Sequence, residues 1–130
     1  MASVSSMPPM LRLQRSLQSG IYIMTAAWQV VYTESCVVSF LFAGAEIDLS
    51  VMAGVDAIDI RVRKTLTVGG AWIVHEQAPT YVGPQPVNHP TVHIGTIANT
   101  FGIEIAMRQT AGVLRLITCE FNDAKRIGLA

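Results

Sequence analysis

Charged side chains are scarce in this chain: Asp, Glu, Lys and Arg make up 14% of its 130 residues, while 51% of the residues are apolar. Typical domains carry about 25% charged residues. The nine acidic and nine basic residues cancel, so the basic surface of a nucleic-acid-binding protein is missing and nucleic acid is excluded as a partner. So few charged side chains are not enough to cover the surface of an isolated monomer. We therefore expect a large protein interface, in a homo-oligomer such as a trimer or in a larger assembly; the alternative is a monomer with an uncharged polar surface.

Cysteine is also rare. Cys36 and Cys119 lie inside apolar runs, and no Cys-x-x-Cys spacing is present. Cysteines in such surroundings are commonly buried thiols, which is our prediction, with a single disulfide between the two as the open alternative. The pattern is unlike that of a small secreted domain held together by several disulfides.

Long uninterrupted apolar runs are missing as well. The uncharged span from Ser16 to Thr33 is divided by Gln18, Gly20 and Gln29. Its apolar blocks are therefore too short for a membrane-spanning helix, and no cleavage site follows at the distance typical of a signal peptide. We expect no membrane segment and no membrane partner.

Motifs for catalysis, cofactors and metals are absent from the sequence. It has no Gly-x-Ser-x-Gly turn and no Gly-rich phosphate loop. Of the three histidines, His75, His89 and His93, the last two are four residues apart. On an extended chain this spacing separates them by about 13 Å, too far for one metal ion. We predict a protein that is not an enzyme and that uses no cofactor and no metal.

The clearest positive signal is the stretch from Asp56 to Val68. Most even positions are apolar, and most odd positions, among them Arg61 and Arg63, are polar. A period of two gathers the apolar side chains on one face of a strand, whereas they would scatter around a helix. We predict a strand in a sheet that is dry on one side, with this apolar face: Ile58, Ile60, Val62, Leu66 and Val68.

Other segments also have strand character, and none favours a helix. We predict strands at 21–32 (two strands or one bent strand), 36–42, 45–51, 71–76, 91–97, 103–108 and 113–118, with turns at 33–35, 69–70 and 99–102. Segment 36–42 is apolar almost throughout, as in a strand buried on both faces. The last two strands should form a hairpin across 109–112. About eight short strands favour an all-β fold, an antiparallel β-sandwich or jelly roll, with a closed barrel as the alternative.

Two segments lack this periodicity. Residues 1–19 contain the pair Pro8-Pro9 and predict an extended N-terminal arm that docks on a neighbouring subunit or packs on its own domain. The domain should span 20–122, followed by a tail at 123–130. Loop 77–90 holds four prolines, and long loops of this kind commonly make contacts. The predicted interface residues come from the arm and the loop: Met10, Leu11, Leu13, Leu17, Tyr81, Val82 and Val87.

Three aromatic residues offer a different function. Trp28, Trp72 and Tyr81 could form a stacking platform for sugar rings. For the two tryptophans the alternative is core packing, because aliphatic residues flank both of them. Tyr81 lies in the proline-rich loop and is expected to be exposed.

One segment resembles a known class of proteins. The stretch Phe101–Phe121, especially Phe-Gly-Ile-Glu-Ile-Ala-Met-Arg-Gln-Thr-Ala-Gly at 101–112, is similar to the small β-sandwich proteins of tailed-bacteriophage virions, such as capsid decoration (cement) proteins. The resemblance implies a virion structural protein that is assembled in the host cytoplasm and binds itself and other virion proteins, such as a major capsid protein. It implies no set of functional residues. The alternative is a carbohydrate- or receptor-binding module of a host-attachment tail or fibre, with a glycan as partner.

Overall fold

The computed structural model describes residues 14–123. Within this range the chain forms strands and no helix, as predicted. The strands are β1 (Gly20–Ile23), β2 (Gln29–Phe42), β3 (Ala45–Asp48), β4 (Ala57–Thr65), β5 (Ile73–Gln77), β6 (Tyr81–Val82), β7 (Thr91–Ile94), β8 (Ile97–Ala111) and β9 (Leu116–Phe121). They number nine rather than about eight, because the proline-rich loop contains the two-residue strand β6.

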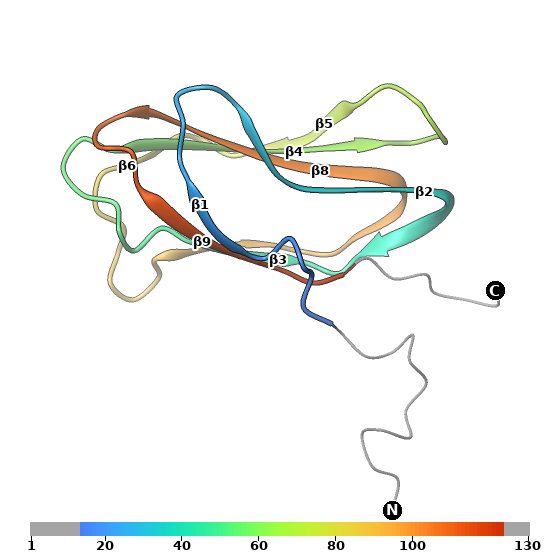
Figure 1. Cartoon of the computed structure of the whole chain (residues 1–130), viewed down its shortest axis with the longest axis horizontal. Coiled ribbons are helices and arrows are strands. Elements are labelled where there is room, and N and C mark those ends of the chain that lie inside the picture. The colour runs from blue at the N-terminus through green and yellow to red at the C-terminus, as the bar shows by residue number, and fades with distance from the viewer. Residues whose placement is uncertain (1–13, 124–130) are drawn as a thin grey trace, which may run out of the picture.

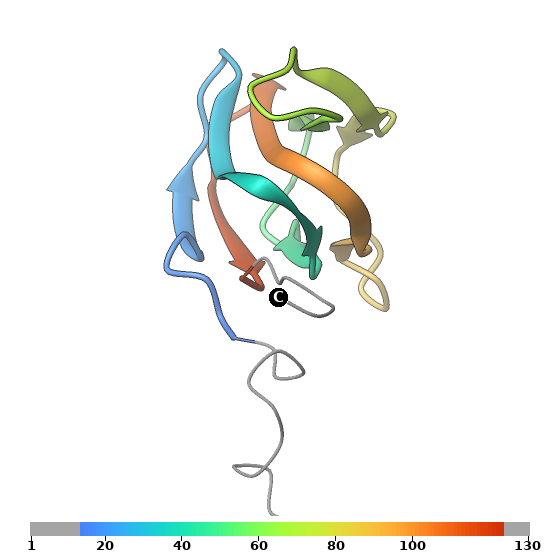
Figure 2. The same ribbon diagram turned by 90° about the vertical axis from the view of Figure 1, so that its right-hand side faces the viewer.

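All paired strands are antiparallel, and they form two sheets. One sheet has the order β1-β9-β3-β7; the other has the order β2-β8-β4-β5, with β6 paired to β4 beyond the end of β5. The two sheets form an upper and a lower layer in Figure 1, and Figure 2 shows how β2 and β8 curl. Successive strands alternate between the two sheets, except that β4, β5 and β6 follow one another in the same sheet.

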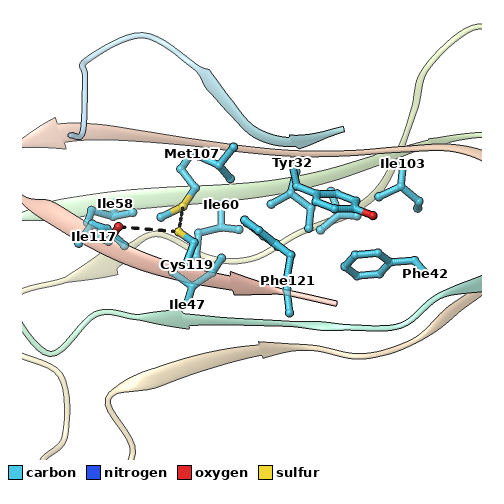
Figure 3. Packing of buried hydrophobic residues seen from close by; sticks show 14 of the residues in the cluster. Tyr32, Phe42, Ile47, Ile58, Ile60, Ile103, Met107, Ile117, Cys119 and Phe121 are labelled. Carbon is cyan, nitrogen blue, oxygen red and sulfur yellow. Dashed lines mark hydrogen bonds between the residues drawn. The ribbon is translucent and has the colours of Figure 1, made fainter. Parts of the chain in front are cut away.

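The core lies between the two sheets. Tyr32 on β2 packs against Phe42 and Phe121, with ring centroids 5.3 and 5.0 Å apart, and aliphatic side chains from both sheets fill the remaining space (Figure 3). The predicted inward face of β4 is confirmed for Ile58, Ile60 and Val62, which are at most 4% exposed. Alternation along a strand therefore produces the dry face expected from the sequence.

Leu66 and Val68 were predicted on the same dry face, and this prediction is wrong. Both side chains are more than half exposed. The reason is that β4 ends at Thr65 and the chain turns back to β5. The predicted turn at 69–70 is present, with Gly69 at a φ of +66°, a conformation that glycine adopts without steric strain.

The two thiols have different surroundings, and neither is in a disulfide. Cys119 is fully buried, with its Sγ 3.9 Å from the Sδ of Met107 (Figure 3). Burial raises the pKa of Cys119 to about 12, so it remains a neutral thiol at physiological pH. Cys36 is only half-buried.

The predicted turn at 33–35 is wrong. These three residues continue β2, where they pair with Glu104, Ile103 and Gly102 of β8. The turn at 99–102 is wrong as well, because β8 runs through it. Gly102 instead allows close packing: a Cβ there would lie 2.8 Å from the Thr65 Oγ1 and 3.1 Å from the Trp72 ring. The glycine marks a close approach within a strand rather than a turn.

Segment 36–42 is not buried on both faces, in contrast to the prediction. Val37 and Val38 are 75% and 46% exposed. The register of β2 against β8 shifts between Ser35 and Phe40, so the stretch between them leaves the regular ladder. An irregularity of this kind redirects side chains, and here it turns apolar ones outward.

The predicted hairpin of 103–108 and 113–118 is also wrong. β8 pairs with β2 and β4, whereas β9 pairs with β1 and β3. The residues after β8 carry the chain from one sheet to the other. Hydrogen bonds of the Gln109 side chain to the Val113 carbonyl and the Arg115 amide hold this crossing.

Asp56 joins the crossing to the start of β4. Asp56 is 1% exposed. Its carboxylate accepts hydrogen bonds from the amides of Ala53 and Val113 and from the Arg115 guanidinium, at 2.9, 3.1 and 2.6 Å. The Arg115 hydrogen bond is the main cause that lowers the pKa of Asp56, and the Ala53 amide adds to it. A Cβ at Gly112 would lie 2.0 Å from this carboxylate, so only glycine fits there.

We expect Asp56→Asn to lower the thermal midpoint by on the order of 10 °C, because the uncharged amide cannot satisfy the same three donors. In the wild type the lowered pKa means that the unfolded chain binds more protons near pH 4 than the folded chain. Stability should therefore fall as the pH drops through the ordinary value of 3.8 towards the folded-state pKa.

Calorimetry between pH 7 and pH 2 checks both effects. Asp56→Asn should lose part of the acid dependence, whereas Asp48→Asn, which neutralises a carboxylate that accepts one backbone hydrogen bond in an exposed turn, should behave like the wild type. Equal melting curves for Asp56→Asn and the wild type at every pH would contradict the role assigned to Asp56.

Candidate interaction surface

The predicted interface residues fall into three groups. Leu17, Val82 and Val87 are exposed, at 101%, 63% and 94%, as a contact surface requires. Tyr81 was expected to be exposed, but it is half-buried and packs against the core. The remaining three, Met10, Leu11 and Leu13, lie outside the described residues.

The arginines that the structure describes are paired within the chain. All five arginines among residues 14–123 contact a carboxylate of the same chain, at 2.5 to 3.9 Å: Arg15 with Glu120, Arg61 and Arg63 with Glu104, Arg108 with Asp59, and Arg115 with Asp56. Four of these carboxylate contacts involve a side chain that is at most 10% exposed. Charges held in this way add little to the hydrated outer surface.

A layer of guanidinium and indole groups covers the outer face of the β2-β8-β4 sheet. The guanidinium groups of Arg61 and Arg108 lie 4.3 and 4.4 Å from the ring centroid of Trp28, and that of Arg63 lies 6.0 Å from Trp72. Such contacts combine cation–π attraction with burial. Trp28 is thus neither a core residue nor an open stacking platform, because two arginines contact its ring. Trp72 has a single, more distant arginine and also lines a groove.

Arg61 lies at the centre of this layer. Burial lowers the pKa of Arg61, and the charge of Arg63 adds to the effect. Its Nε is buried and makes no hydrogen bond within the described residues. Glu104 supplies the nearest opposing charge, at 3.9 Å from Arg61 and 2.5 Å from Arg63.

We expect Glu104→Gln to destabilise the fold by about 3 kcal/mol, because it leaves two largely buried guanidinium groups without a carboxylate. Urea denaturation measures this loss. Glu76→Gln removes a carboxylate from the exposed strand β5 and serves as the matched control, with a change below about 0.5 kcal/mol. Equal stabilities for the two variants would show that the paired layer does not support the fold.

Large apolar side chains are exposed over much of the described surface, at seventeen positions. Three of them gather on the outer face of the β1-β9 pair: Ile21, Ile23 and Leu116, with Ile23 directly opposite Leu116. Scattered exposed aliphatics are ordinary in a monomer, but adjoining ones are typical of contact surfaces.

The open edges of the sheets are protected unequally. Between β1 and β2, the Gln18 side chain donates to the Thr33 carbonyl and accepts from the Thr33 amide, both at 2.9 Å. The Tyr22 hydroxyl lies 2.9 Å from the Val31 carbonyl. These side chains occupy backbone groups that a foreign strand would need. In contrast, β5 pairs only with β4, and all five of its residues are exposed.

A groove of about 590 Å³ lies beside the β4–β5 turn, and we call it the end groove. Residues from β2, from the turn and from β8 line it, mainly Cys36, Val37, Val68, Gly70, Trp72 and Phe101. Most of these side chains are apolar. The irregular stretch of β2 and the early end of β4 thus expose apolar groups on the same groove.

A second hollow of about 380 Å³ lies under the proline-rich loop. Tyr81 lines it together with Gln85, His89 and His93. Burial raises the pKa of Tyr81, and the charge of Glu76 adds to this. His93 also contacts Glu46 at 2.6 Å. This hollow therefore contains an aromatic ring beside hydrogen-bonding groups.

No group of three or more His, Cys, Asp and Glu residues within 14–123 is arranged to hold a metal ion. In the same range no helix is long and apolar enough to cross a membrane. Comparison with protein-family models, with curated proteins and with solved structures gave no match.

Sequence reasoning missed the end groove. Val37 was predicted to be buried and Val68 to lie on the dry face, whereas both line the groove. The apolar run at 36–42 was a usable signal, but an unbroken run does not reveal which of its residues face outward.

Proposed function

We propose that this chain is a non-enzymatic structural protein of a virion, similar to capsid decoration (cement) proteins, that stabilises a particle through subunit–subunit contacts. The main support is one observation: seventeen large apolar side chains are exposed, while the described arginines are paired within the subunit. Burying apolar area at about 25 cal/mol per Å² would drive the association.

The strand order supports a specific form of the fold, the jelly roll. Without the two-residue β6, eight strands remain, and they pair as first with eighth (β1-β9), second with seventh (β2-β8), third with sixth (β3-β7) and fourth with fifth (β4-β5). This nested pairing arises when one long hairpin rolls up into two sheets. Jelly rolls occur in viral capsid proteins and in lectins.

The expected partners are other copies of the chain, in a trimer or another closed oligomer, and a major capsid protein. The exposed residues Leu17, Val82 and Val87 and the rest of the N-terminal arm at 1–19 would supply contacts. The unprotected edge of β5 would allow a neighbouring strand to be added. Assembly would take place in the host cytoplasm, and the protein would remain in the virion.

The alternative function, a carbohydrate- or receptor-binding module of a host-attachment apparatus, is favoured by the hollow beside Tyr81. An aromatic ring next to amide and imidazole groups suits a sugar. Tyr81→Ala should then abolish binding on a glycan array without changing the oligomeric state. The decoration function predicts no glycan binding by either protein.

Sedimentation of the purified chain tests the proposal. We expect an oligomer at micromolar concentration, and we expect Leu17→Asp or Val87→Asp to weaken association by about tenfold or more, since each places a charge in an apolar contact. Thermal midpoints should stay unchanged, because both side chains are almost fully exposed. Thr96→Asp, at an exposed polar position, is the matched control. A 14.1 kDa monomer at all concentrations would refute the proposal.

A further inference from the structure

The end groove has the chemistry of a site for an extended proline-containing segment. The rings of Trp72 and Phe101 and the side chains of Val37 and Val68 line it, with the hydroxyl-bearing residues Ser35 and Thr65 beside them. Aromatic-lined grooves bind proline-rich chains because the polyproline II conformation is preformed and costs little entropy to hold.

The chain itself contains a matching segment. Residues 7–13 read Met-Pro-Pro-Met-Leu-Arg-Leu. Four apolar side chains surround the proline pair, and the segment contains no acidic group. Consecutive prolines favour the polyproline II conformation. Apolar side chains on a sequence that favours polyproline II match the chemistry of an aromatic-lined groove.

The residues that follow this segment, Arg15 and Ser16, are fixed on the sheet that does not line the end groove. Arg15 forms an isolated bridge with Asn122 and an ion pair with Glu120 at 2.7 Å, and the Ser16 amide donates to the Phe121 carbonyl at 2.8 Å. β9 belongs to the β1-β9-β3-β7 sheet, whereas the end groove is lined from β2, β8 and the β4–β5 turn. Pro9 lies six positions before Arg15, and six extended residues reach about 20 Å, so the proline pair can extend away from this fixed point towards a neighbouring copy.

We propose that the Pro8-Pro9 segment of one copy binds in the end groove of a neighbouring copy. This inference rests on the proposed function, because it requires the chain to self-associate, and it names the contact that links the copies. Repeated around a closed ring, the contact joins every subunit to the next one through the same surfaces.

A disulfide trap tests the contact in the full-length chain. Cys36 lines the end groove, and the other cysteine, Cys119, is fully buried. A Met10→Cys variant should therefore form a disulfide with Cys36 of a neighbour under mild oxidation, which gives a covalent dimer or larger ladder on non-reducing gels. Adding Cys36→Ser should abolish the product, and Ala2→Cys in place of Met10→Cys should give much less of it.

Two matched surface variants supply an independent measurement. Val37 and Val55 are 75% and 72% exposed, but only Val37 lines the end groove. In the Met10→Cys background, Val37→Glu should lower the yield of covalent dimer by about tenfold, because it places a charge in the apolar contact. Val55→Glu should leave the yield unchanged.

Three results would overturn the inference: a disulfide formed within one chain, no disulfide with Cys36, or equal yields for Val37→Glu and Val55→Glu. Sedimentation of the same variants separates this failure from failure of the proposed function. An oligomer without the Cys36 product removes only the end groove as the binding site. A monomer at every concentration removes the proposed function itself.

Discussion

The pairing of arginines with carboxylates inside the subunit is the constraint on which the rest of the structure depends. The chain has only nine basic and nine acidic residues, and it uses five arginines to hold Glu120, Glu104, Asp59 and Asp56. The pairs fix the crossing after β8 and the outer face of one sheet. These pairs occupy nine of the eighteen charged side chains, five arginines and four carboxylates, which are then less available to hydrate the remaining surface. A surface so poor in free charge fits the proposed self-association.

The indole rings make this use of charge possible on an outer sheet face. A guanidinium group that is partly buried loses part of its hydration free energy. The cation–π contact with Trp28 offsets this loss for both Arg61 and Arg108. Glu104 and Asp59 supply the opposing charge. Arginine suits this arrangement better than lysine, because a planar, weakly hydrated cation stacks on an aromatic ring. Arginines therefore cover Trp28, a residue whose position in the sequence suggested a stacking platform for a ligand.

The sequence was sufficient for local periodicity but not for pairing. The alternation at Ile58, Ile60 and Val62 correctly identified a strand and its dry face, because the side-chain period of a strand is local. The stretches 33–35 and 99–102 contain residues typical of turns, yet long-range pairing of β2 with β8 keeps both extended. The assignment of β8 and β9 to different sheets depends on Asp56 and Arg115, 59 positions apart. Contacts at such a distance leave no periodic signal, and so the end groove was not predictable either.

The sheet edges are protected unequally, so the two sides of the molecule differ in their capacity to accept another strand. Gln18 and Tyr22 occupy the backbone groups along the β1–β2 side, whereas β5 has no comparable cover among the described residues and the end groove opens beside the turn that precedes it. Unprotected edges promote uncontrolled association unless something restricts it. Blocking one side and leaving the other open would restrict the proposed association to one set of surfaces. Under the proposed function, a chain with one unprotected side and a separately anchored N-terminal segment would join its neighbours head to tail, the geometry that closes into rings.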